Sequence, residues 1–281
     1  MIHVAAFSGG KDSTALVLWL REQGIPFTAI FMDTGWENPL TYGYIAYINE
    51  TLLDGGLVTI KSTRYAGFQD LAVQRNMVPR QHARFCTEEL KILPMQTYIE
   101  AQEDDVTVYQ GIRAEESMWR ARMTARVWTD EAGGYWIERP LFTWTAGEVF
   151  ALLAKHGVKP NPLYLLGAGR VGCWPCIYVN KRELRAYLKT TPGIKERVIA
   201  LEEELNASVR AKDPGADWRS FFHADYIPSR WCSENFTNKD GEARRVPRAA
   251  DVFRYLEQDD DQLQLLPEPA SGCMSIYNLC E

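Results

Sequence analysis

The first thirty residues alternate between apolar runs and a helical pattern. A short apolar run at 2–7 predicts a buried strand, and apolar residues at helical spacing across 12–23 predict a helix. A second apolar run at 27–32 predicts another strand. Because a helical crossover joins strands that run in the same direction, this order predicts a parallel sheet.

The alternation continues to about residue 157. It predicts strands at 57–60 and 106–110, helices at 68–75 and 88–102, a hairpin at 128–137 and a helix that begins at Thr145 and stops at Gly157. We therefore expect residues 1–157 to form an α/β domain. Its sheet is predicted to be open, mainly parallel and twisted, with helices on both faces.

The pattern changes after residue 157. Residues 158–179 are rich in proline and glycine, and only 180–189, 192–207 and 246–258 have helical patterns. The segment 213–238 is aromatic and irregular, and the last ten residues are too apolar for a free tail. We expect residues 158–281 to form a cysteine-containing loop and helical region that packs on the first domain.

Composition and charge narrow the class of protein. The chain has 281 residues, 46% hydrophobic and 24% charged, and a net charge of −6. No apolar stretch is long enough for a membrane span, and the first residues lack a signal-peptide pattern, so we expect a cytoplasmic protein. Acidic chains do not favour general binding to DNA. Arginines at 113, 120, 122 and 126, and again at 244, 245 and 248, leave open a local basic groove for a nucleic-acid substrate.

The segment 8–13, Ser-Gly-Gly-Lys-Asp-Ser, joins the first predicted strand to the first predicted helix, and we call it the glycine turn. Such a turn is an anion site, because backbone N–H groups and the helix dipole face the ligand. The turn has neither the Walker pattern nor the dinucleotide pattern. Gly9 and Gly10 would let the backbone approach phosphates, and Lys11, Ser8 and Ser13 could bond phosphate oxygens. Asp12 suits a Mg²⁺ ion or a helix cap.

Two further strand ends supply candidate nucleotide contacts. Asp33 and Thr34 follow the second predicted strand, where an acidic residue could bond ribose or adenine. Gly111 ends the predicted strand 106–110, and Arg113 offers a planar fork for a phosphate or sulfate.

The glycine turn resembles the PP-loop of the N-type ATP pyrophosphatases, also called adenine nucleotide alpha hydrolases. Three more segments resemble the phosphoadenosine phosphosulfate (PAPS) reductase-like branch of that family: RFCTEELK at 84–91, GIRAEES at 111–117 and RPLFTWT at 139–145. The resemblance covers about residues 1–160 in the right order. It implies an adenine nucleotide held by the glycine turn and attacked at its α-phosphate, with Lys11, Asp12 and Arg113 as catalytic residues.

The resemblance predicts an ATP pyrophosphatase-type enzyme that adenylates an acceptor for sulfur transfer. Nucleic acid or a nucleotide would be the acceptor, and a protein such as a cysteine desulfurase the sulfur donor. One alternative is a reductase that binds PAPS or adenosine 5′-phosphosulfate (APS). The chain lacks the E-C-G-[IL]-H segment of the thioredoxin-dependent reductases, which favours ATP. A second alternative is a non-catalytic subunit that senses a nucleotide or binds a partner.

Six cysteines suggest metal or redox use rather than structural disulfides in a reducing compartment. Cys173 and Cys176 form a C-x-x-C pair, which could hold a metal or act as a redox pair. Several PP-loop enzymes have a [4Fe–4S] cluster, so the resemblance implies one here, with ligands Cys86, Cys173, Cys176 and Cys273. Cys280 and Cys232 are alternative fourth ligands, zinc is the alternative metal, and buried thiols without metal remain open.

Overall fold

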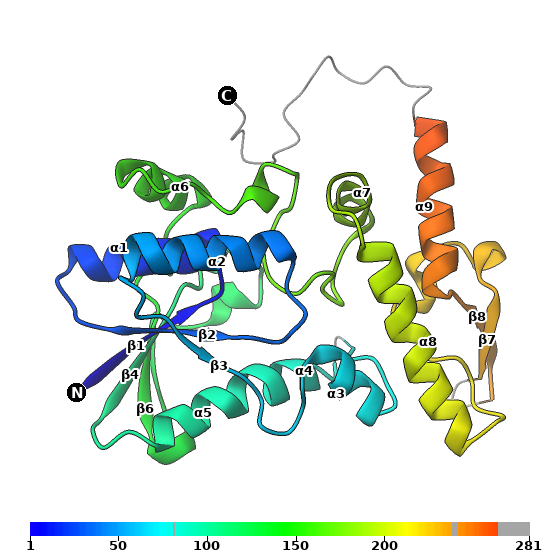
Figure 1. The fold of residues 1–281 in the computed structure, drawn as a ribbon, viewed down its shortest axis with the longest axis horizontal. Helices are drawn as coiled ribbons and strands as arrows, with labels where there is room; N and C mark the ends of the chain where they lie inside the picture. The colour runs from blue at the N-terminus through cyan, green and yellow to red at the C-terminus, as the bar shows by residue number, and fades with distance from the viewer. Residues whose placement is uncertain (81, 238–240, 264–281) are drawn as a thin grey trace. The chain divides into compact units, whose positions relative to one another are not determined.

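The computed structural model describes residues 1–80, 82–237 and 241–263 (Figure 1). The described chain divides into two units. The first contains Met1–Gly67 and Thr87–Cys173, and the second contains Phe68–Cys86 and the described residues from 174 onward. The first unit therefore continues past residue 157, where the sequence predicts the boundary, to Cys173.

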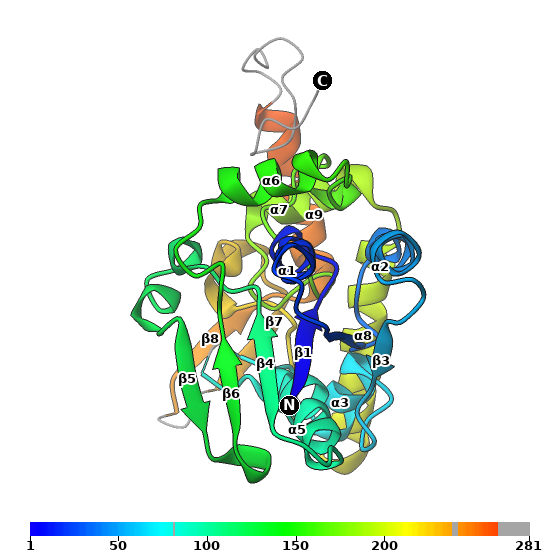
Figure 2. The ribbon, with the colours of Figure 1, turned by 90° about the vertical axis from the view of Figure 1, so that its left-hand side faces the viewer.

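A six-stranded sheet forms the centre of the first unit, in the order β3-β2-β1-β4-β6-β5. All its neighbouring strands are parallel except β5, which pairs antiparallel with β6. Figure 2 shows β5, β6, β4 and β1 side by side. The strands are β1 (Ile2–Phe7), β2 (Thr28–Met32), β3 (Val58–Ile60), β4 (Val106–Gln110), β5 (Arg126–Thr129) and β6 (Tyr135–Glu138).

Helices cover both faces of this sheet, because side chains alternate along each strand. Ala5 and Phe7 of β1 join a core with α1 (Lys11–Glu22), α2 (Pro39–Leu52) and α6 (Ala146–Lys155). Val4 joins a second core with α5 (Leu93–Glu100). Figure 1 shows α1 and α2 on one side of the sheet and α5 on the other. The predicted α/β fold class is confirmed.

The parallel register brings functional segments to one edge. Ala6 of β1 lies opposite Ile30 of β2 and Gln110 of β4. The residues that follow these three strands, including the glycine turn, Asp33 and Gly111, therefore leave the sheet at the same edge. This is the edge where open α/β sheets bind ligands.

Local signals explain several helix boundaries. Thr145 caps α6, and it exchanges hydrogen bonds with Glu148 as the predicted capping box requires. The predicted helix 88–102 is a π-helical stretch, Glu88–Ile92, followed by α5. Pro94 is the second residue of α5, directly after the π-helical stretch.

The described part of the second unit is mainly helical and includes the strand pair β7–β8. Phe68 packs edge-on against the ring of Phe221, and Arg80 donates to the carbonyls of Ser220 (2.6 Å) and Phe221 (3.1 Å). These contacts explain why residues 68–86 belong to this unit. Its elements are α3 (Phe68–Gln74), α7 (Lys181–Thr190), α8 (Ile194–Lys212), α9 (Ala249–Leu263), β7 (Glu234–Thr237) and β8 (Ala243–Val246); α4 (Phe85–Thr87) lies at the boundary.

Two expectations about the later chain have different outcomes. The hairpin β7–β8 overlaps the segment that was predicted to be irregular. The apolar tail, with Cys273 and Cys280, lies outside the described residues. None of the described helices has the length and apolar character needed to cross a membrane.

Candidate nucleotide-binding site

The glycine turn follows β1 and leads directly into α1. Gly9 has φ +71°, a left-handed conformation, and a Cβ there would lie 2.9 Å from Cγ1 of Ile45. Both the backbone angle and the close packing therefore require glycine. Gly10 is the N-cap of α1, and it provides no side chain to cap the first N–H groups. The start of α1 is therefore suited to an anion.

The hydroxyl groups of the glycine turn bond within the turn. The Ser13 hydroxyl accepts from the Ser8 N–H (3.2 Å) and donates to the Gly10 carbonyl (3.0 Å). The Ser8 hydroxyl lies 3.2 Å from that of Ser13. These bonds hold the turn in its conformation without a ligand, and the predicted contacts of Ser8 and Ser13 with phosphate remain predictions.

Charged side chains at the start of α1 alternate in sign. Lys11 Nζ lies 2.8 Å from Asp12 Oδ2, and Arg113 Nε lies 2.5 Å from Asp12 Oδ1. Arg113 also pairs with Glu115. The Lys11 and Arg113 side chains are only 4% and 3% exposed. Asp12 therefore lies between two buried cations at the predicted phosphate site. We call these three residues the row Lys11–Asp12–Arg113.

The pKa values of Arg113 and Glu115 follow from these ion pairs. Burial opposes the charge of Arg113, but the carboxylates of Asp12 and Glu115 outweigh it and raise the pKa of the guanidinium. The hydrogen bond from Arg113 lowers the pKa of Glu115. Arg113 also donates to the Trp144 carbonyl at 3.2 Å. In this arrangement Arg113 orients Asp12 and Glu115, and its predicted contact with a ligand remains a prediction.

Gly111 allows β4 to approach the first turn of α1. A Cβ at this position would lie 2.6 Å from the Asp12 carbonyl oxygen. No side chain fits at that distance without moving the backbone. Glycine at the end of β4 therefore sets the position of Asp12.

Asp33 and Thr34 lie at the carboxyl end of β2, as predicted. Asp33 accepts from the Gly35 N–H (2.9 Å) and the Tyr42 hydroxyl (2.7 Å), and it pairs with Lys61 (3.0 Å). Burial raises the pKa of Asp33, but these donors outweigh it and the pKa is lowered. Thr34 is buried and donates to Glu37 at 2.7 Å. The Asp33 carboxylate is therefore charged and oriented by donors on several sides, and its predicted bond to ribose remains a prediction.

Two residues that the sequence analysis did not single out hold the glycine turn. Asn161 donates to the Gly9 carbonyl at 2.9 Å, and the Tyr164 hydroxyl accepts from the Lys11 N–H at 3.0 Å. Their exposed fractions are 0% and 1%. Asn161 caps a short 3₁₀ helix that begins at Pro162, so the Asn-Pro pair was the available signal.

The candidate metal ligands are divided between the two units. Cys173 belongs to the first unit, where its backbone bridges to Glu37 and its sulfur lies 3.8 Å from the Thr34 hydroxyl. Cys86 and Cys176 belong to the second unit. Cys273 lies outside the described residues. Among the described residues, no three histidine, cysteine, aspartate or glutamate side chains form a group that could hold a metal ion. The predicted cluster therefore remains a prediction, and we assign no reaction step to it.

Most of the clustered arginines have acidic partners. Arg120 pairs with Glu116, Arg126 with Glu138 and Arg248 with Glu234. Together with the pairing of Arg113, this neutralises much of the charge that suggested a basic groove at these positions. The groove itself remains a prediction.

Comparison with known proteins agrees with this geometry. Residues 2–179 match the phosphoadenosine phosphosulfate reductase domain. The chain belongs to this family. The resemblance inferred from the glycine turn and its three companion segments is thereby confirmed. Proteins of this family bind adenine nucleotides, and the residues that would do so in this chain remain predictions.

Members and neighbours of the family show how far the likeness extends. An uncharacterized 37.8 kDa protein of Escherichia phage 186 is 31% identical and covers 82% of this chain and 81% of its own. The adenosine 5′-phosphosulfate reductase of Allochromatium vinosum is 31% identical over 62% of this chain and 67% of its own. The crystal structure of PAPS reductase from Candida auris has a TM-score of 0.51 at 18% identity, over 63% of this chain and 83% of that one. This last likeness is one of fold.

Proposed function

We propose that this PAPS reductase family protein uses ATP to adenylate an acceptor, and that the adenylated acceptor then receives sulfur. The observation that carries the proposal is the row Lys11–Asp12–Arg113 at the start of α1, where the N-cap Gly10 has no side chain. The row places two buried cations and one carboxylate where the triphosphate would lie.

In the proposed reaction, an oxygen of the acceptor, such as the carbonyl oxygen of an amide, attacks the α-phosphorus of ATP. The bond from that phosphorus to the bridging oxygen breaks, and pyrophosphate leaves with the electron pair. The Lys11 ammonium group and the backbone N–H groups of Asp12 and Ser13, in the first turn of α1, would stabilise the charge on the phosphates. Arg113 keeps Asp12 in place beside Lys11.

Asp12 is the residue that would hold Mg²⁺. Its oxygens face the two cations of the row and its side chain is 14% exposed, so the carboxylate is oriented but reachable. One carboxylate together with phosphate oxygens is a usual environment for Mg²⁺. The ion would neutralise phosphate charge when bound.

The adenylated acceptor would then react with a sulfur nucleophile. A persulfide supplied by a donor such as a cysteine desulfurase would attack the activated carbon with its outer sulfur, and AMP would leave with the acceptor oxygen. A second thiol of the donor would then cleave the S–S bond, forming a disulfide with the first thiol and releasing the thiolated acceptor. We infer nucleic acid or a nucleotide as the acceptor.

A sulfonucleotide reductase is the second candidate function. The relative from Allochromatium vinosum that carries the name adenosine 5′-phosphosulfate reductase favours it. PAPS or APS would occupy the same turn, and its reduction would release sulfite. A subunit that binds a nucleotide without turnover is the third candidate.

One experiment separates these functions. Anaerobically purified protein is mixed with ATP, Mg²⁺ and candidate acceptors, and pyrophosphate is measured; PAPS and APS are tested in parallel for sulfite. Acceptor-dependent pyrophosphate that is lost in Lys11→Ala supports adenylation. Lys155→Ala is the matched control, because Lys155 pairs with Glu22 on the exposed surface of the same unit. Sulfite without pyrophosphate would favour the reductase, and ATP binding without turnover the non-catalytic subunit.

The [4Fe–4S] cluster is a separate proposal from the cysteine pattern. Anaerobic purification should yield iron and acid-labile sulfide, and Cys173→Ser should lose the brown colour. Stoichiometric zinc with negligible iron would replace the cluster by zinc.

A further inference from the structure

Tyr164 contacts Lys11 with both parts of its side chain. The Tyr164 hydroxyl accepts from the Lys11 backbone N–H at 3.0 Å, and the centre of the Tyr164 ring lies 5.4 Å from Lys11 Nζ. An aromatic ring attracts a cation that lies over its face at such a distance. Tyr164 therefore holds both the backbone and the ammonium group of the lysine that the proposed function places against the phosphates.

The surroundings of Tyr164 keep its hydroxyl beside the glycine turn. Tyr164 is 1% exposed, and its ring packs edge-on against the ring of Phe150 in α6, with 5.8 Å between the ring centres. The hydroxyl also lies close to Gly10, where a Cβ would be only 3.4 Å away from it. Packing from α6 on one side and the turn on the other therefore fixes the position of this hydroxyl.

The Tyr164 hydroxyl divides the N–H groups at the start of α1 into two kinds. The N–H of Lys11 already has an acceptor. In the part of the chain that the structure describes, no acceptor meets the N–H groups of Asp12 and Ser13, and the helical hydrogen bonds begin at the Thr14 N–H. An anion at this helix start would therefore bond to Asp12 and Ser13 rather than to Lys11.

We propose that Tyr164 is a positioning residue for the nucleotide. By occupying the Lys11 N–H, its hydroxyl directs the phosphates to the N–H groups of Asp12 and Ser13. Its ring steadies the Lys11 ammonium group, which lies 2.8 Å from the Asp12 carboxylate. This inference rests on the proposed function, since it names a residue that sets where the triphosphate lies.

The first test measures the exchange of single backbone amides by NMR. In the wild type without ligand, the Lys11 amide should exchange about tenfold more slowly than those of Asp12 and Ser13, because it alone of the three has an acceptor. ATP should slow the other two. In Tyr164→Phe, which keeps the ring and loses the hydroxyl, the Lys11 amide should exchange about tenfold faster, and ATP should slow it again.

The second test separates positioning from structural support. Tyr164→Phe should change ATP affinity little, because a third N–H becomes open to the phosphates. Its kcat for acceptor-dependent pyrophosphate should fall about tenfold or more, because small displacements of reacting groups slow a reaction strongly. Tyr226→Phe is the matched control: the Tyr226 hydroxyl donates to the Val179 carbonyl at 3.1 Å in the second unit, and its loss should change neither quantity.

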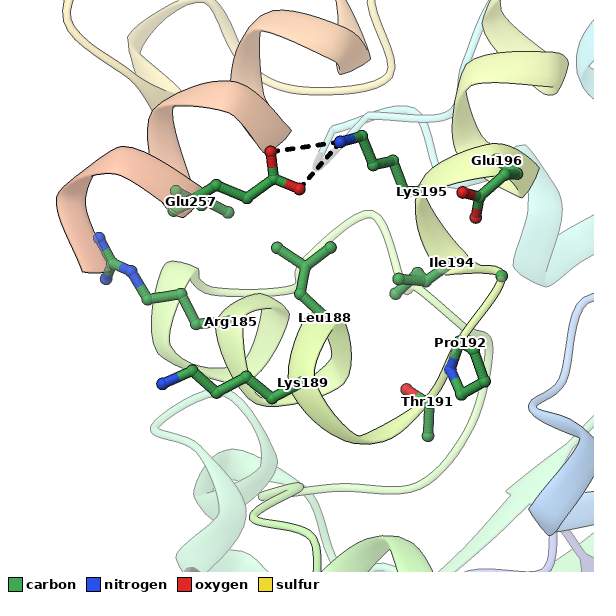
Figure 3. A pocket seen from close by; sticks show the side chains of 11 residues that line it. Arg185, Leu188, Lys189, Thr191, Pro192, Ile194, Lys195, Glu196 and Glu257 are labelled. Carbon is green, nitrogen blue, oxygen red and sulfur yellow. Dashed lines mark hydrogen bonds and ion pairs between the residues drawn. The ribbon is translucent and has the colours of Figure 1, made fainter. Parts of the chain in front are cut away.

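A cavity of about 320 Å³ in the second unit supplies comparison amides (Figure 3). Lys195 meets the carboxylate of Glu257 there at 2.8 and 3.2 Å, and Glu196 also lines the cavity. Because cations and carboxylates lie together in its wall, the cavity does not match the charge of a triphosphate. ATP should therefore leave exchange of the Lys195 and Glu196 amides unchanged.

Two results would overturn the proposal. One is a wild-type Lys11 amide that exchanges as fast as that of Asp12, which would show that the hydroxyl does not hold it. The other is an equal loss of ATP affinity and kcat in Tyr164→Phe, which would reduce Tyr164 to structural support. Failure of the proposed function looks different: no acceptor would give pyrophosphate, while the exchange of the Lys11 amide, which needs no turnover, would still decide the role of Tyr164.

Discussion

Arg113 and Arg120 lie on the loop that follows β4, and each pairs with carboxylates. The Arg113 side chain is 3% exposed and contacts Asp12 and Glu115. The Arg120 side chain is 32% exposed and contacts Glu116, four residues earlier. A buried charge that loses its partner cannot be solvated by water, whereas a surface charge can. The two arginines should therefore respond differently to the same substitution.

Arg113→Met should lower the free energy of unfolding by about 3–5 kcal/mol, the usual cost of breaking a buried ion pair. Arg120→Met should lower it by about 0–1 kcal/mol, the usual value of a surface pair. Urea denaturation of both variants and the wild type measures the difference. Equal losses would show that the row Lys11–Asp12–Arg113 is not a buried unit.

At the scale of elements, the close contact between the end of β4 and the start of α1 determines where the backbone of Asp12 lies in the candidate site. Gly111→Ala would force a Cβ to 2.6 Å from the Asp12 carbonyl, so the backbone must shift. We expect a loss of about 1–3 kcal/mol in stability and at least tenfold weaker ATP binding. Gly147→Ala in α6 is the matched control, because its Cβ meets nothing closer than 3.8 Å. Calorimetric titration with ATP compares them, and equal affinities would contradict the proposed role of this contact.

Glu202 joins three segments of the second unit. From α8 it accepts from the backbone N–H groups of Phe221 (2.6 Å) and Ala249 (2.8 Å) and from the Trp218 indole (3.3 Å). Burial raises its pKa from the ordinary 4.5 to about 7, although these donors act in the opposite direction. Between these two values the native state holds a proton that the unfolded state has released.

The free energy of unfolding should therefore fall as the pH rises from about 4.5 to about 7. Above about pH 7, the stabilisation that comes from the protonated Glu202 should be absent. Glu202→Gln cannot ionise, so its melting temperature should fall less between pH 5 and 8 than that of the wild type. Glu203→Gln, at the exposed neighbouring position, should keep the wild-type slope. A Glu202→Gln profile parallel to that of the wild type would contradict the assignment.

The sequence pattern predicted some elements better than others, for physical reasons. The strands β1, β2 and β4 are short, largely apolar runs that end at turn residues, a pattern typical of buried strands. Helix α2 was missed because Pro39–Leu52 is rich in β-branched, aromatic and glycine residues that lower helix propensity. The Asn38 cap and Pro39 were the signals available, and the Asn38 side chain does accept from the Leu40 N–H.

At the scale of the whole molecule, distance along the chain limited the prediction of the site. The glycine turn is a local motif, and its six residues could be named from sequence. Asn161 and Tyr164 bond to it from about 150 positions later, through contacts that only the folded first unit creates. The same contacts extend that unit past residue 157 to Cys173.

Because the chain divides into two units, binding of a nucleotide should change amide hydrogen exchange in only one of them. All the predicted nucleotide contacts belong to the first unit, so ATP should slow amide hydrogen exchange in the glycine turn, near Gly111 and in 161–164. Amides of α8 in the second unit should exchange at unchanged rates. Lys11→Ala should remove the protection, because it loses the cation that is proposed to contact the phosphates. Exchange measured by mass spectrometry with and without ATP checks this; protection confined to the second unit would place the nucleotide there and refute the proposed site.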